Sequence, residues 1–309
     1  MSRHFGSEVG SVKVDRPPSP LHSYETRGES GPASVIEPSA VPEQKTMPFS
    51  VICSGNDASM PVGKASILSG SNAERKGFVC SVVSGSGGSG KSTVSTLMGI
   101  VSQYSGVRTA IIDADFQFGD QQWLLGSEGA LDAVTLLRHP ERVSELVAEG
   151  GIPAIICPPG RLEDSELAYS SIKQIVSLVR SSFDVVIVNT GSFWTDALLD
   201  LFELSSQVLF LVDQRPSSVR ACVHALDLCI RCGLPTQQFR FALNRCGKQA
   251  LLTSLDVSCA LKGVEVRELR EGGFVVSELL GAGLPLELVS SKNAFVEDVM
   301  TLAGELLPL

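Results

Sequence analysis

The chain has 309 residues, 43% of them hydrophobic, which is enough to bury the core of one large domain or two smaller ones. Its formal net charge is −9, and because residues 1–76 hold eight basic and eight acidic side chains, the negative excess lies in residues 77–309. An acidic domain is a poor platform for nucleic-acid backbones, which require clustered Lys and Arg, so the composition disfavours DNA as a partner.

Residues 1–76 are predicted to be a disordered tail and linker. The run RPPSPLHSYETRGESGPASVIEPSAVPEQ is rich in Pro, Ser, Gly and Glu and has few apolar side chains to bury. PFSVICSG (48–55) is compatible with one strand, although no clear second element follows it. The N-terminus lacks the apolar core of a signal peptide, and no apolar run approaches the roughly 18 residues of a membrane span. We therefore expect a cytoplasmic protein without direct membrane insertion, recruited to a membrane or pole only through partners.

From Gly77 onward, short apolar runs alternate with stretches of helical periodicity. Such runs, apolar on both faces and separated by helices, are typical of a parallel sheet covered on both sides, so residues 77–309 are predicted to form one α/β domain. The predicted strands are 77–84, 108–114, 152–157, 183–189, 207–213, 239–244 and 263–269.

Helical spacing is clearest in two places. One intervening stretch has periodic apolar residues at Leu167, Ile172, Ile175, Val176 and Val179. A last helix is predicted over about 292–307, with a core face formed by Phe295, Val299, Leu302, Ala303 and Leu306. The polar positions of this last helix include acidic residues, which opposes a role in membrane targeting.

The segment SGSGGSGKST, Ser84 to Thr93, contains the Gly-x-x-x-x-Gly-Lys-Ser frame of a phosphate-binding loop. It follows a predicted strand and opens a helix, the context in which this motif is credible. The glycines allow backbone N–H groups to converge on phosphate oxygens, and the helix N-terminus favours negative charge. In such loops the lysine reaches the β- and γ-phosphates and the next hydroxyl ligates Mg²⁺, roles that fall to Lys91 and Ser92. The residues predicted to bind the nucleotide are Gly85, Ser86, Gly87, Gly88, Ser89, Gly90, Lys91, Ser92 and Thr93.

Polar residues end three other predicted strands, at the sheet edge where ligands of such folds bind. Asp113 and Asp115 offer carboxylates for Mg²⁺-bound or attacking water. Asn189 stands where an acidic group is expected, and its uncharged amide grips a Mg²⁺-bound water more weakly. Asn244 and Arg245 are predicted to bind the nucleotide, because an Asn amide can donate to and accept from a purine.

With these residues in place, the chain resembles the MinD/ParA group of deviant Walker ATPases over residues 77–307. Within that group it looks most like the CpaE/TadZ branch, the localisation ATPases of Flp (Tad) pilus assembly. The runs that carry the resemblance are GSGGSGKST, IIDADFQFGDQQWLLG, FDVVIVNTG, LVDQRPSSVRACVHAL and FALNRCGK.

The resemblance implies a P-loop NTPase three-layer fold with a mostly parallel sheet of about seven strands. It implies ATP and Mg²⁺ as cofactors, a homodimer with nucleotide at the interface, and pilus or secretion assembly proteins as partners. Lys91, Asp113 and Asp115 would be catalytic, Ser92 and Asp113 would face the metal, and Asn244 would contact adenine.

Two positions depart from the family pattern. Ser86 occupies the place of the signature lysine that reaches the partner's phosphates, and Asn189 that of the Walker B Asp. Losing one such preorganised contact commonly costs on the order of 10²–10³ in rate. We therefore expect ATP binding with slow or absent hydrolysis. The residues before the domain are also too few and too polar for the receiver-like domain usual in the CpaE/TadZ branch.

Other functions stay open. A ParA- or MinD-like partitioning or septum-site regulating ATPase is the alternative, and so is a scaffold that binds ATP without turnover. A bacterial tyrosine kinase is disfavoured because the only tyrosines are Tyr24, Tyr104 and Tyr169, without a C-terminal cluster.

Overall fold

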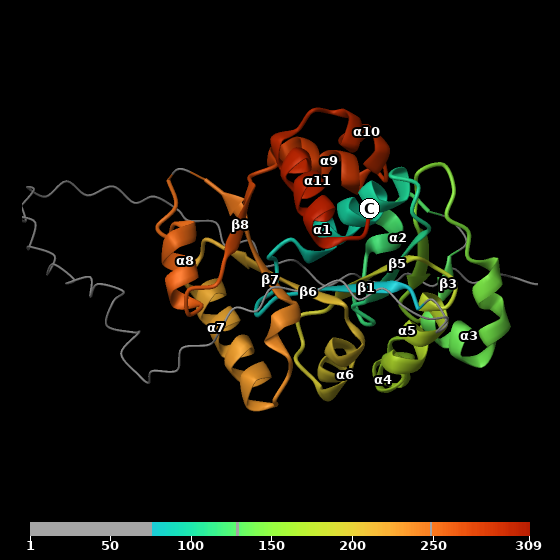
Figure 1. Ribbon diagram of the computed structural model, residues 1–309. Helices are drawn as coiled ribbons and strands as arrows, with labels where there is room; N and C mark the ends of the chain where they lie inside the picture. The colour runs from blue at the N-terminus through green and yellow to red at the C-terminus, as the bar shows by residue number, and fades with distance from the viewer. Residues whose placement is uncertain (1–75, 128–129, 248) are drawn as a thin grey trace, which may run out of the picture. The chain divides into compact units, whose positions relative to one another are not determined.

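The computed structural model describes residues 76–309 except 128–129 and 248 (Figure 1). The predicted tail, with the possible strand at 48–55, lies outside the described residues apart from its last residue. The described residues form a three-layer α/β fold, as predicted. The strands are β1 (Phe78–Val83), β2 (Thr109–Ala114), β3 (Leu131–Asp132), β4 (Ala154–Cys157), β5 (Val185–Thr190), β6 (Gln207–Asp213), β7 (Phe239–Cys246) and β8 (Val266–Arg270).

These strands form one sheet in the order β3-β4-β2-β5-β1-β6-β7-β8, and every neighbouring pair is parallel. Each of the seven predicted runs overlaps one strand, although β5, β7 and β8 end one or two residues beyond their predicted runs. The additional strand is β3, whose two residues are too short to show any periodicity in the sequence.

Helices cover both faces of the sheet (Figure 1). On one face lie α1 (Lys91–Tyr104), α2 (Gln121–Leu124), α9 (Gly273–Gly281), α10 (Pro285–Ser290) and α11 (Ala294–Leu306). The other α-helices are α3 (Ala133–Arg138), α4 (Ser165–Ser170), α5 (Ile172–Arg180), α6 (Asp196–Leu204), α7 (Pro216–Arg231) and α8 (Ser254–Ala260), and short 3-10 helices lie at Pro140–Glu145, Leu162–Asp164 and Thr236–Gln238. No helix among the described residues is long and apolar enough to cross a bilayer.

The strands are apolar on both faces because each face supports a separate core. Successive strand residues point to opposite sides, so Ile111 and Leu209 pack toward α1 and α11, whereas Ile112 and Phe210 belong to the core on the other side. All four side chains are fully buried. This two-sided burial is why the strands read as continuous apolar runs rather than as alternating patterns.

The last predicted helix is confirmed as α11, and its five predicted core residues are all buried. The stretch around Leu167 differs from the prediction. The helix is interrupted at Ser171, between α4 and α5. Leu167 is five residues before Ile172, so it lies off the core face and is 44% exposed, whereas Ala168 is buried. The later apolar residues of that stretch are buried in α5 as predicted.

The topology brings the predicted site residues to one edge. Because all strands are parallel, the loops that follow β1, β2, β5, β6 and β7 lie at the same end of the sheet. Asp113 pairs in register with Asn189, and Asp213 with Asn244. These five strands are neighbours in the order β2-β5-β1-β6-β7, so the phosphate loop lies at the centre of the group.

Candidate functional site

The phosphate loop connects β1 to α1 and depends on its glycines. Gly88 and Gly90 have φ of 73° and 96°, in the left-handed region that other residues rarely adopt. A β-carbon on Gly90 would lie 2.2 Å from Asn244 Nδ2, and one on Gly85 would lie 2.4 Å from the carbonyl carbon of Ala221. The loop is therefore held tightly between β7 and α7, with no room for larger residues at these positions.

Lys91 begins α1, and its side chain turns back across the loop. Its Nζ lies 3.3 Å from Ser84 Oγ and 3.3 Å from Ser192 Oγ, and the residue is only 8% exposed. Burial lowers the pKa of the Lys91 amine, while the nearby charge of Asp115 acts in the opposite direction. Both of its hydrogen bonds go to hydroxyl groups, so no carboxylate of residues 76–309, as far as these are described, is hydrogen-bonded to this ammonium, and its charge is directed at the loop.

Ser89 provides a test of whether the loop fits an anion. Its Oγ is buried and makes no hydrogen bond with any residue that the structure describes. Buried polar atoms are nearly always satisfied in native proteins, so an orphaned hydroxyl needs a partner from outside the chain. A hydroxyl donor within a glycine-rich loop at a helix N-terminus is a donor that a phosphate group would satisfy. The residues present therefore fit a bound phosphate.

Asp113 and Asn189 form a buried pair at the ends of β2 and β5. Asp113 is fully buried, and its carboxylate accepts hydrogen bonds from Asn189 Nδ2 and from the backbone N–H of Gln121, each at 3.0 Å. Burial raises the pKa of the Asp113 carboxyl to about 7, although these hydrogen bonds act to lower it. Asn189 is thus a hydrogen-bond donor to Asp113, a role that a carboxylate at this position could not perform.

Asp115 is the more accessible of the two carboxylates. It is half-buried, and its Oδ1 lies 3.2 Å from the position of a β-carbon on Gly191, in the loop after β5. The same oxygen accepts a hydrogen bond from the backbone N–H of Phe118 at 3.3 Å. The structure therefore places Asp115 near Lys91 and near the loop after β5. The roles of Asp113 and Asp115 toward metal and water stay predictions.

Asn244 lies beneath the phosphate loop and is buried. Its Nδ2 donates to the carbonyl oxygen of Ser89 at 2.8 Å, and its Oδ1 accepts from the backbone N–H of Arg245 at 2.9 Å. Arg245 is exposed and has a left-handed φ of 58°. In this arrangement the Asn244 amide supports the loop's shape, and its contact with adenine stays a prediction.

Sequence reasoning missed the residues that follow β6. Ser86 Oγ donates to Ser218 Oγ at 3.1 Å, and Arg215 Nη2 donates to the carbonyl oxygen of Gly87 at 3.3 Å. Both contacts join the phosphate loop to the start of α7. The rule that placed Asp113 and Asn244 also applies to the strand at 207–213, and it would have drawn attention to Arg215, two residues beyond that strand.

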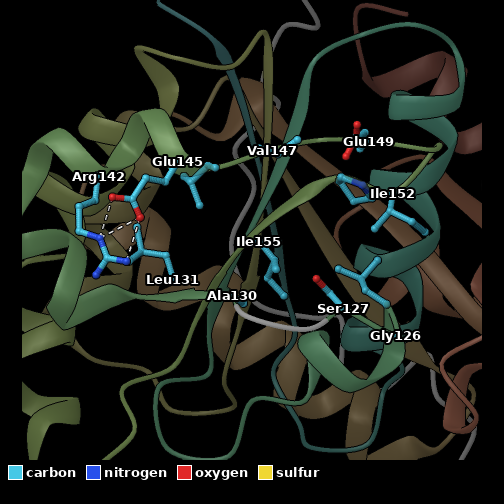
Figure 2. Close-up of a pocket in the computed structure, with 13 residues that line it drawn as sticks. Gly126, Ser127, Ala130, Leu131, Arg142, Glu145, Val147, Glu149, Ile152 and Ile155 are labelled. Atoms are coloured by element: carbon cyan, nitrogen blue, oxygen red, sulfur yellow. Dashed lines mark hydrogen bonds and ion pairs between the residues drawn. The ribbon is translucent and has the colours of Figure 1, made fainter.

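A separate pocket of about 380 Å³ lies beside the amino-terminal end of β4 (Figure 2). Its lining includes Ile152 and Ile155, and none of the residues predicted to bind nucleotide. Arg142 and Glu145, which face one another across its rim in Figure 2, form an ion pair of 2.8 Å. Because this arginine already has a carboxylate partner, the pocket is a poorer binding site for an anion than the phosphate loop is.

Comparisons with known proteins identify a domain family and a shared fold. Residues 80–271 match the protein family described as "CobQ/CobB/MinD/ParA nucleotide binding domain". The antiactivator FleN of Pseudomonas aeruginosa is 27% identical over 146 residues, 46% of this chain and 52% of FleN, so the alignment spans about half of that relative.

Two solved structures share the fold. A ParA family ATPase from Chlorobium tepidum superposes with a TM-score of 0.65 at 18% identity, covering 73% of this chain and 98% of that one. The septum site-determining protein MinD from Pyrococcus horikoshii, complexed with Mg-ADP, superposes with a TM-score of 0.64 at 15% identity, covering 75% and 96%.

Proposed function

Because the chain belongs to the CobQ/CobB/MinD/ParA nucleotide-binding domain family, we propose that it binds ATP with Mg²⁺ through Gly85–Thr93. The observation that carries the proposal is Lys91, a nearly buried ammonium at a glycine-rich loop, whose hydrogen bonds within the described part of the chain go to two hydroxyl groups. Burying a charge without a hydrogen-bonded anion is costly, and a nucleotide's phosphates would supply that anion. The orphaned Ser89 hydroxyl supports the same proposal.

Ser92, Asp113 and Asp115 are the groups that would hold Mg²⁺. When bound, the metal would neutralise phosphate charge and order water near the nucleotide. Burial raises the pKa of the Asp113 carboxyl to about 7, so this group is partly protonated near neutral pH. A bound cation would favour its ionised form, which can then ligate the metal. Asp115 supplies the accessible carboxylate, and Asn189 keeps Asp113 oriented through its amide.

We further propose that hydrolysis is slow and that nucleotide binding is the working step. Ser86 carries no charge, and its hydroxyl is donated to Ser218 within the same chain. Asn189 is also uncharged and is committed to Asp113. The chain thus has fewer charged groups for a hydrolytic transition state than the family pattern implies, while its means of binding phosphate are complete. We expect a homodimer with nucleotide at the interface.

The proposed cellular role is a nucleotide-dependent organiser of Flp/Tad pilus or secretion machinery. The support is the resemblance of the run at 115–120 to the CpaE/TadZ branch; in the fold this run packs at the site, with Phe116 buried and Gly119 against the Asp113 carboxylate. A β-carbon on Gly119 would lie 2.3 Å from Asp113 Oδ2. The second candidate is a regulator in the manner of a partitioning, septum-site or antiactivator protein, and it is favoured by the similarity to FleN.

Purified protein tests the biochemical part. We expect Mg·ATP binding and a doubling of mass by light scattering, with phosphate release well below that of a variant carrying both S86K and N189D. K91A should abolish binding, and undiminished ATP affinity in K91A would refute the assignment of the phosphate loop.

The cellular role is tested by replacing the natural protein with the K91A variant in its own host. Loss of pili or of their normal position, with unchanged transcription of their genes, would support an organiser. Changed transcription with intact assembly proteins would support the regulator instead.

A further inference from the structure

Arg215 brings a positive charge to the phosphate loop from a different part of the chain. It lies between β6 and α7, and its Nε donates to both oxygens of Asp213, at 2.9 and 3.0 Å. Its Nη2 donates both to Asp213 Oδ2 at 2.5 Å and to the carbonyl oxygen of Gly87 at 3.3 Å. Hydrogen bonding to Asp213 raises the pKa of the guanidinium further, and 56% of the side chain is exposed at the loop. The group is therefore a permanent cation, fixed on one side and open on the other.

The guanidinium lies at the end of the loop where a terminal phosphate is expected. Lys91 Nζ marks the position of the β- and γ-phosphates. Ser192 Oγ lies 3.3 Å from that nitrogen and 3.6 Å from the position of a β-carbon on Gly87. Gly87, whose carbonyl receives the Arg215 hydrogen bond, is thus on the same side of the loop as the Lys91 ammonium.

We propose that Arg215 binds the terminal phosphate of ATP, exchanging the Gly87 carbonyl for phosphate oxygens and supplying the charge that Ser86 lacks. This inference rests on the proposed function that Gly85–Thr93 binds ATP. A guanidinium binds phosphate through two parallel donors, and these charge-assisted hydrogen bonds are stronger than one to a neutral carbonyl. Asp213, which is 3% exposed, holds the arginine in place during the exchange. Arg215 would therefore select ATP over ADP.

A purely structural role for the same residue makes a different prediction. The backbone N–H of Arg215 donates to Asp213 Oδ1 at 3.0 Å, so this segment also forms the turn that opens α7. If the side chain only fastened the loop to α7, its loss would weaken ATP and ADP binding equally. The ratio of the two affinities separates the two roles.

The experiment is titration of Mg·ATP and Mg·ADP into the full chain and three single variants, at one fixed salt concentration. R215A should lose about 10- to 100-fold in ATP affinity, the range for a hydrogen bond to a charged group, and less than about threefold in ADP affinity. R215K should recover part of the ATP affinity. The matched control is R231A, which removes an exposed arginine ion-paired to Asp227 at 3.0 Å at the far end of α7, and should change neither affinity.

A fourth variant moves the charge back into the loop. Adding S86K to R215A should restore ATP affinity if the site needs one cation at its terminal phosphate. Equal losses for ATP and ADP in R215A, or unchanged ATP affinity, would overturn the inference while leaving ATP binding by the wild type intact. Absence of ATP binding by the wild type would instead overturn the proposed function, and the inference with it.

Discussion

The buried carboxyl of Asp113 should make the stability of this fold depend on pH in a predictable direction. The pKa of this carboxyl rises from an ordinary value of 3.8 to about 7 in the folded protein, chiefly because of burial. Between these pH values the folded state holds a proton that the unfolded state has released, so the free energy of unfolding falls as pH rises. The full stability is present below pH 3.8, and the loss is complete above about pH 7. A change of this size corresponds to about 4 kcal/mol.

The variant D113N removes the titrating carboxyl and keeps the side chain's shape. Its amide places a donor where Asp113 now accepts, so D113N carries a constant cost that does not vary with pH. Urea unfolding of both proteins from pH 4 to pH 8, without nucleotide and with divalent metal removed, isolates the effect as a difference. The advantage of the wild type over D113N should shrink by about 4 kcal/mol across this range. A difference constant to within about 1 kcal/mol would show that burial does not raise the pKa of the Asp113 carboxyl.

Three further predictions follow from single contacts. N189D should destabilise the protein by about 3 kcal/mol relative to the wild type at pH 8, because it replaces a donor to Asp113 with a second carboxylate. Urea unfolding should show recovery when Mg²⁺ is added, and a loss relative to the wild type that is equal at pH 5 and pH 8 would contradict this. G119A should cost about 1–3 kcal/mol because its β-carbon would collide with Asp113, and thermal unfolding indistinguishable from the wild type would argue against the packing. T253A should cost about 1 kcal/mol, since Thr253 and Asp256 cap α8 reciprocally, whereas T301A, at an exposed position of α11, serves as the comparison in the same denaturation series.

The sequence determined the central part of the fold because its signals are local. Each long strand is a run of apolar residues bounded by polar ones, and burial on both faces makes such runs visible without any tertiary information. The phosphate loop is equally local: its glycines and Lys91 are consecutive, and their spacing alone specifies a turn leading into a helix. The break at Ser171 was not predicted, because the apolar pattern continues across it.

What Asn189, Asn244 and Arg215 do was decided only by the tertiary structure. Their places in the sequence show that polar side chains end strands, but not whether an amide faces a ligand or another side chain. Strand order sets β5 against β2, so Asn189 donates to Asp113, and it sets β7 beside the loop, so Asn244 supports Ser89. Arg215 reaches Gly87 across 128 residues of chain. Contacts over such separations depend on how the sheet is assembled, and no local pattern records them.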